Sequence, residues 1–373
     1  MKQTVLKTLA AMALFTASAS AANVTINLTG STAFRAATNA AILASLGSPT
    51  YAYNEATAGD GFNKCTYAII KGTHNGNNIT VRVFWAGSVE GVQYPSTGVS
   101  LAKFIPTTQA TSGGGTNLGN VTFSDPGVVD AGMSDVFKSS AGFPDADLQD
   151  TQVGVVPFVF VTHPNAPFSN MNSQLMKVVY GQDYAFLSNF IAGGSSTVSV
   201  YGCGRNSDSG TRVTTLAETG YGYTNSVYQY TATVNGTTTL SFAQNSPANN
   251  GASSGGTLAK SLAKPSSDTV GWGVGYIGVG DLQGTNLTMT YNGQAYSPAN
   301  IKNGSYTLWG YEHCFVAARV RDAGTGTDDE ARKNWINSMT GLLIADPSAS
   351  AGIKLSDMTV TRPGDGAAIT NNF

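Results

Sequence analysis

Hydrophobic and polar residues change their spacing several times along this chain, and each change predicts a different element. Val24, Ile26 and Leu28 alternate with polar residues, which predicts a strand that ends near Gly30. Apolar residues then recur at helical spacing over residues 34–43. We therefore expect a strand, a tight turn and a helix, an arrangement whose first helical N–H groups can hold an anion.

The alternation of strand and helix patterns continues along the chain. Residues 153–162 are almost continuously apolar, as in a strand buried on both faces, and residues 269–280 read as a glycine-rich strand. Helical spacing is found at residues 183–194 and again at residues 328–344. Because strands alternate with helices, we expect an α/β fold in which a mostly parallel sheet is flanked by helices.

The length of 373 residues and the two long apolar strands predict two lobes. We expect lobe 1 to be discontinuous, with residues 22–155 and 281–373, and lobe 2 to comprise residues 156–280. Within lobe 2, period-two patterning on both sides of an Asn-Gly pair predicts a hairpin insertion at about residues 224–245.

Residues 1–21 have the three parts of a signal peptide: a basic start, a short apolar stretch and a cleavage site at Ala19-Ser20-Ala21. A buried N-terminal helix is the alternative. The apolar stretch is too short to span a membrane, and no cysteine follows the cleavage site to carry a lipid. These features predict a soluble protein that is periplasmic or secreted.

Composition narrows the class of protein further. Hydrophobic residues make up 41% of the chain and aromatic residues 10%, which excludes a disordered protein. Charged residues make up only 11%, the formal net charge is −2, and no run of lysine or arginine occurs. Nucleic acid is therefore not an expected partner.

The cysteines do not form a metal or redox motif. Cys65, Cys203 and Cys314 are far apart in the sequence and cannot all pair, so one disulfide with a free thiol and three free thiols both remain open. None of the three histidines lies in a polar constellation. We therefore expect neither a metal site nor a catalytic cysteine.

Polar loops follow several of the predicted strands. Residues 30–34, 87–91 and 205–211 form three such loops, and Asp135 ends a fourth strand. In open α/β sheets, ligands bind outside the carboxyl ends of the strands. The loops are rich in hydroxyl, backbone N–H and guanidinium donors, which favours a dehydrated oxyanion as the ligand.

Four short motifs carry a resemblance to a known family. They are TGSTAF, AGSVEGV, AGMSD and RNSDSGT, and NIKNGSYTLWGYE follows them. In this order and spacing they resemble the periplasmic phosphate-binding proteins of phosphate ABC transporters, from about Asn23 to about Val320. The resemblance implies a two-lobed periplasmic-binding-protein fold of type II, with the ligand cleft between the lobes. It also implies a monomer without cofactor or enzymatic activity, whose partners are inorganic phosphate and the permease subunits of an ABC transporter.

The resemblance also implies which residues contact phosphate. The expected donors are backbone N–H groups, hydroxyls and one guanidinium, and the expected acceptor is one carboxylate. These residues are Ala33, Phe34, Ser88, Asp135, Arg205, Ser209, Gly210 and Thr211. A carboxylate at Asp135 repels an anion that has no proton to donate, so the site should accept protonated phosphate and reject sulfate.

The sequence differs from the family pattern at one position. The family has an acidic residue two positions after the arginine, whereas this chain has Ser207 there and Asp208 one position later. Either the loop geometry differs or Arg205 lacks its usual partner. Arg35 and Arg212 are further cations that could compensate, and selection among phosphate, arsenate and phosphonates stays open.

Two other functions remain open at this point. A secreted surface or matrix protein could reuse the phosphate-binding fold, which the hairpin, the Gly/Ser-rich stretch at residues 249–257 and the low charge would suit. A phosphatase-like hydrolase would need Ser209 as nucleophile, but no histidine lies near it in the sequence and no G-x-S-x-G motif occurs. Taken singly, Asp135 could cap a helix, Arg205 could lie on the surface and Ser209 could be an ordinary N-cap.

Overall fold

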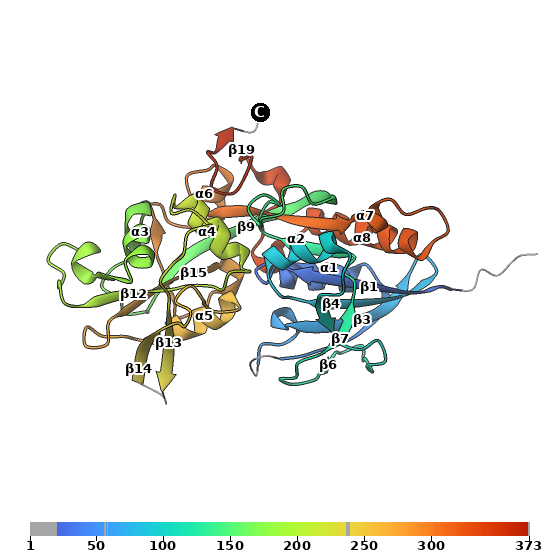
Figure 1. Ribbon diagram of the computed structural model, residues 1–373, viewed down its shortest axis with the longest axis horizontal. Helices are drawn as coiled ribbons and strands as arrows, with labels where there is room; N and C mark the ends of the chain where they lie inside the picture. Colours follow the sequence, from blue (N-terminus) through green and yellow to red (C-terminus); the bar gives the residue numbers. More distant parts are fainter. Residues whose placement is uncertain (1–20, 56, 58, 236–238, 372–373) are drawn as a thin grey trace, which may run out of the picture.

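The computed structural model describes residues 21–55, 57, 59–235 and 239–371. The predicted signal peptide lies almost entirely outside these residues. The described chain forms two halves that share one sheet of 12 strands (Figure 1). Along its main path the sheet has the order β11-β12-β15-β9-β18-β8-β1-β4-β3-β2-β6.

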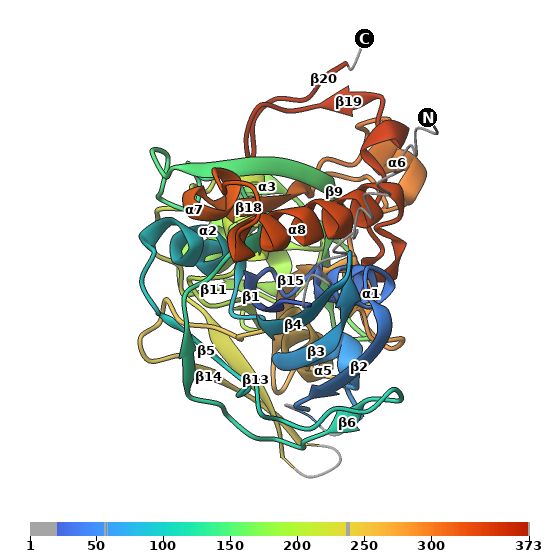
Figure 2. The ribbon, with the colours of Figure 1, turned by 90° about the vertical axis from the view of Figure 1, so that its right-hand side faces the viewer.

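The first half contains the beginning and the end of the chain. Its strands are β1 (Asn23–Gly30), β2 (Gly47–Tyr53), β3 (Tyr67–His74), β4 (Asn77–Phe84), β6 (Thr116–Asn117) and β8 (Ala131–Ser134). Its helices are α1 (Arg35–Ala44), α2 (Ser88–Thr97), α7 (Ala318–Arg321) and α8 (Asp328–Ala345). Strand β1 runs parallel to both β4 and β8. Figure 2 shows β1, β4, β3 and β2 side by side, with α8 lying along this half.

The second half has its own parallel strand pair and its own helices. Its strands are β11 (Tyr184–Phe186), β12 (Ser199–Cys203), β15 (Trp272–Gly278) and β16 (Leu287–Thr288). Its helices are α3 (Ser173–Gly181), α4 (Gly210–Glu218), α5 (Gly255–Leu262) and α6 (Pro298–Lys302). Strands β12 and β15 run parallel, so their carboxyl ends lie at the same edge of the sheet.

Two long strands join the halves. In β9 (Leu148–Thr162), residues from Leu148 to Pro157 pair with β18 (Trp309–Ala317), whereas residues from Phe158 onward pair with β15. Strand β18 also pairs with β8. All of these pairs are antiparallel. Residues 153–162 of β9 are buried without interruption, because both of its faces are covered, which explains its continuous apolar sequence.

The predicted α/β, two-lobed fold class is confirmed, as are the strands at residues 24–28 and 153–162. The helix predicted at residues 328–344 is α8, which buries Trp335, Ile336, Met339 and Leu343 at helical spacing. The hairpin consists of β13 (Tyr230–Asn235) and β14 (Thr239–Gln244), and its tip lies outside the described residues. The lobe boundaries at residues 155/156 and 280/281 stay a prediction.

Two local predictions are wrong. Residues 183–194 do not form a helix, since Tyr184 to Phe186 pair with β12 as an edge strand and a 3-10 turn follows at Leu187–Asn189. The polar loop expected at residues 87–91 is mostly the first turn of α2, which begins at Ser88. In the first case strand pairing overrode the helical spacing, and in the second a glycine-rich sequence hid a helix.

Candidate anion-binding site

The strand-end segments predicted to form the site meet in the structure. The clearest sign is Gly210, the first residue of α4. A Cβ atom added there would lie 1.5 Å from Asp135 Oδ1 and 2.6 Å from Ser88 Cβ. Only glycine therefore fits where α4, α2 and the end of β8 touch.

Backbone hydrogen bonds tie the same segments together. Ser31 N–H donates to Met133 O at 2.8 Å, and Gly87 N–H donates to Gly30 O at 3.1 Å. Across the two halves, Val89 N–H donates to Asp208 O at 3.1 Å. The turns after β1, β4, β8 and β12 therefore surround one small region.

Arg205 supplies the buried guanidinium of this region. Its side chain is fixed by Nε donating to Ala252 O at 3.0 Å and Nη2 donating to Thr32 Oγ1 at 3.1 Å and to Ser253 O at 3.2 Å. Arg205 is 1% exposed, and its Nη1 has no hydrogen-bond partner among the described residues. Burial lowers its pKa, while Asp281 and Asp135 act in the opposite direction.

Asp135 supplies the buried carboxyl group. It is 1% exposed, and its Oδ1 has no hydrogen-bond partner in the described part of the chain. Burial raises the pKa of Asp135 to about 6, against the lowering effects of the Ser88 hydroxyl and Arg205. The group is therefore mostly ionised at pH 7 and available as an acceptor.

The other predicted residues lie at the starts of two helices. Phe34 is the N-cap residue of α1, is fully buried, and follows Ala33, which is 8% exposed. Ser209 is the N-cap residue of α4 and accepts the Arg212 N–H at 3.3 Å, and Thr211 lies in the first turn. All eight predicted residues are thus in buried positions around Asp135 and Arg205 or on the helix starts beside them.

The acid with the largest electrostatic effect on Arg205 comes from an unexpected segment, although no hydrogen bond or ion pair joins the two in the described residues. Asp208 lies on the cleft wall and accepts the Ser207 hydroxyl at 3.4 Å, whereas Asp281 gives the largest electrostatic support to Arg205. Asp281 is 5% exposed and lies just beyond β15. The sequence contained a signal for Asp281, because this aspartate follows a glycine-rich strand in the same way that Asp135 follows β8.

Glu312 is the other residue that the sequence analysis missed. It lies in the middle of β18, is fully buried, and neither carboxyl oxygen has a hydrogen-bond partner among the residues described. Burial, and next the neighbouring Asp135, raise the pKa of Glu312 well above its usual value. Burial therefore favours the protonated form of Glu312, which lies beside the site and close to the hydroxyl of Ser31.

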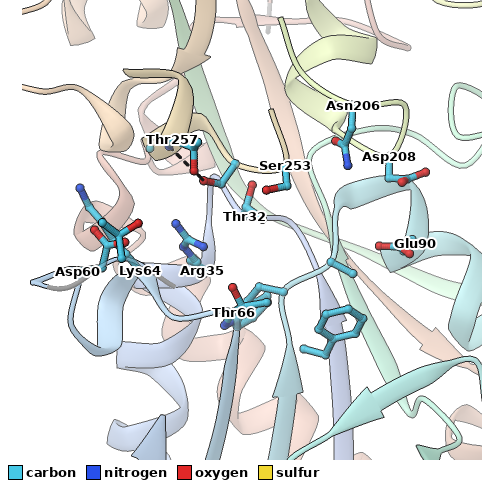
Figure 3. Close-up of a pocket in the computed structure, with 16 residues that line it drawn as sticks. Thr32, Arg35, Asp60, Lys64, Thr66, Glu90, Asn206, Asp208, Ser253 and Thr257 are labelled. Carbon is cyan, nitrogen blue, oxygen red and sulfur yellow. Dashed lines mark hydrogen bonds between the residues drawn. The ribbon is translucent and has the colours of Figure 1, made fainter. Parts of the chain in front are cut away.

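A cleft of about 300 Å³ opens beside these loops (Figure 3). Its lining comes from both halves. Thr32 and Ala86 belong to the first half, and the second half supplies Asn206, Ser253, Ser254, Gly256 and Thr257. Next to the cleft, Lys260 on α5 forms an ion pair of 2.6 Å with Asp60 in the first half.

Other candidate chemistry is weak. The described residues contain no group of three or more His, Cys, Asp or Glu side chains that could hold a metal ion. The three cysteines are separate, buried thiols, and burial raises the pKa of each to about 12. None of them is a thiolate at neutral pH.

Across the described part of the chain, no helix has the length and apolar character needed to cross a membrane.

Comparison with known proteins supports the fold. No protein-family model and no curated relative matches the sequence. Among solved structures, a putative phosphate ABC transporter substrate-binding protein with bound phosphate from Clostridium perfringens is similar, with a TM-score of 0.52 and 14% identity, over 89% of this chain and 99% of that one. An ABC-type phosphate transport receptor from Vibrio cholerae matches with a TM-score of 0.49 and 14% identity, over 88% of this chain and 99% of that one.

The class of protein follows from the first of these similarities. The chain has the two-lobed α/β fold of periplasmic phosphate-binding proteins. In the structure, strand-end turns from both halves of that fold meet around Asp135 and Arg205.

Proposed function

We propose that the chain is an extracytoplasmic substrate-binding protein that captures inorganic phosphate between its two lobes. In this proposal, hinge motion closes the lobes over the anion, and the protein delivers it to the permease of an ABC transporter. The Clostridium perfringens neighbour, whose description names bound phosphate and an ABC transporter, supports this assignment.

One observation carries the proposal. Arg205 Nη1 and Asp135 Oδ1 are buried, and neither has a partner in the described residues. A buried unpaired donor and a buried unpaired acceptor are costly unless a ligand satisfies both. Protonated phosphate does so, because its oxygens accept from the guanidinium and its hydroxyl donates to the carboxylate.

The hydrolase alternative finds less support. The hydroxyl of Ser209 accepts the Arg212 N–H as a helix cap, and no histidine of the described residues hydrogen-bonds to it. A serine nucleophile needs a base within hydrogen-bond reach. A surface or matrix role remains the second candidate, and it predicts that loss of anion binding leaves the role of the protein unchanged.

Calorimetric titration with phosphate and with sulfate tests the proposal. We expect phosphate to bind at micromolar concentration or below and sulfate to bind at least 10-fold more weakly, since sulfate leaves Asp135 unpaired. Asp135→Asn should reduce this discrimination by about 10- to 100-fold, because an amide can donate to sulfate.

The control variant is Asp147→Asn, which removes one carboxylate at a position that is 73% exposed. It should bind both anions as the original protein does. Failure of phosphate to bind, or equal binding of sulfate, would refute the proposed function.

A further inference from the structure

Arg35, the first residue of α1, is a buried cation without a counter-charge. It is 5% exposed, and no carboxylate of the described residues lies within ion-pair distance of it. Its hydrogen bond runs from Nη1 to Cys65 O and is long, at 3.4 Å. The side chain lines the 300 Å³ cleft and also an adjoining recess of about 170 Å³.

The other buried arginines are better satisfied. Arg82 pairs with Asp125, and Arg362 pairs with Glu218 at 2.9 Å. Arg212, the second cation considered from the sequence, donates to Arg205 O, Asn249 O and Asn249 Oδ1 and so supports the loop. A buried guanidinium that lacks such partners is expensive unless something else neutralises it.

The cleft connects Arg35 with the anion site. Thr32 and Ser253 line the cleft, and both accept hydrogen bonds from Arg205. Arg35 is also close enough to Arg205 to lower its pKa by repulsion. Two neighbouring guanidinium groups repel each other until an anion lies between or beside them.

Most of the charges in the cleft are separated. Figure 3 shows Arg35 and Lys64 on one side and Glu90 and Asp208 on the other. Asp60 lies beside Lys64 in the same view, but it already pairs with Lys260 at 2.6 Å. The acids already accept hydrogen bonds, Glu90 from the Tyr94 hydroxyl at 2.5 Å and Asp208 from the Ser207 hydroxyl. The cationic side is therefore the one that still lacks a partner, and Lys64 too forms no ion pair within the described residues.

We propose that the Arg35 side of the cleft binds a second anionic group of the ligand, so that the protein takes diphosphate or a phosphonate carrying a nearby carboxylate. This inference rests on the proposed function, since the first phosphoryl group lies between Asp135 and Arg205. The second group lies against Arg35, whose planar fork suits a phosphate or carboxylate, with Lys64 beside it.

Competition calorimetry with phosphate, inorganic diphosphate and phosphonoacetate tests the inference. We expect diphosphate to bind about 10- to 100-fold more tightly than phosphate, because its second phosphoryl group forms one additional charge-assisted pair with Arg35. Arg35→Gln should abolish this preference, measured within each variant as the ratio of diphosphate to phosphate affinity, and Arg35→Lys should keep part of it. Phosphonoacetate distinguishes a carboxylate from a phosphoryl group as the second anion.

Arg321→Gln is the matched control, since it removes the same charge from α7 outside the cleft lining and should preserve the preference. Thermal melting of each variant shows that it is folded. Diphosphate that binds no tighter than phosphate, or an Arg35→Gln variant that keeps the preference, overturns the inference alone. Absence of phosphate binding by the original protein overturns the proposed function itself.

Discussion

The two ends of strand β8 each carry a buried aspartate in opposite circumstances. Asp130 precedes the strand and Asp135 follows it, and each is 1% exposed. Asp130 accepts the Asn27 N–H at 2.6 Å and contacts Arg319 at 2.5 Å and Arg332 at 3.6 Å. Asp135 has no ion pair within the same distance among the described residues, and its Oδ1 is unpaired.

The difference separates a structural carboxylate from one available to a ligand. Burial raises the pKa of both groups. Two arginines and the Asn27 N–H oppose this at Asp130, whereas the Ser88 hydroxyl and Arg205 oppose it at Asp135. The unpaired Oδ1 of Asp135 fits the binding role proposed above, whereas the contacts of Asp130 are those of a structural carboxylate.

The largest expected effect on stability is at Asp130, the aspartate preceding β8 that forms ion pairs. Asp130→Ala removes the acceptor of the buried Asn27 N–H and one of the two carboxylates that pair with Arg319 and Arg332, so we expect the free energy of unfolding to fall by about 3 kcal/mol. Urea denaturation at pH 7 measures this. A loss below about 1 kcal/mol would mean that the arginines find solvent instead, and that the two ends of β8 do not differ as described.

At Asp135, which has no ion pair among the described residues, replacing the carboxylate by an amide should act in the opposite direction. A carboxyl with a pKa of about 6 when folded, against 3.8 as a model value, keeps its proton longer in the folded state, so the free energy of unfolding falls as pH rises from 4 to 7. The Asp135→Asn variant has no carboxyl group at this position, so its free energy of unfolding should not fall for this reason. Without phosphate it should therefore match the original protein at pH 4 and exceed its stability by about 3 kcal/mol at pH 7. Parallel urea curves at the two pH values decide this, and a constant difference between them would refute it.

The smallest effect is expected at Glu312, which lies beside Asp135. Burial favours the neutral form of Glu312, and Glu312→Gln would replace that form with a neutral hydrogen-bonding group of the same shape. The free energy of unfolding at pH 7 should change by less than about 1 kcal/mol. Stabilisation by several kcal/mol would show that Glu312 is ionised and would place two negative charges at this end of β8.

The elements that could be predicted from the sequence are those set by the local spacing of apolar residues. The alternation around Val24 and Leu28 and the helical spacing from Trp335 to Leu343 reflect one buried face each, so β1 and α8 were predicted. Polar residues after strands indicated the turns of the site, because parallel strands bring their carboxyl ends to one edge.

The parts that could not be predicted depend on tertiary pairing. Residues 184–186 became a strand because β12 offered an unpaired edge. Asp281 stands in for the acid expected near Arg205 only because β15 lies next to β12 in the sheet. Nothing in the local sequence of Glu312 shows that β18 lies beside β8 and so beside Asp135.

The ion pair between Lys260 and Asp60 has a consequence for kinetics. It joins the two halves next to the cleft without help from an anion. If the lobes close over an anion as proposed, part of the attraction that closes them is therefore present before ligand binds. Such a pair weakens as ionic strength rises. Low ionic strength would then keep the ligand-free protein closed for longer and slow the entry of ligand. High ionic strength would shorten the time for which a bound anion is retained.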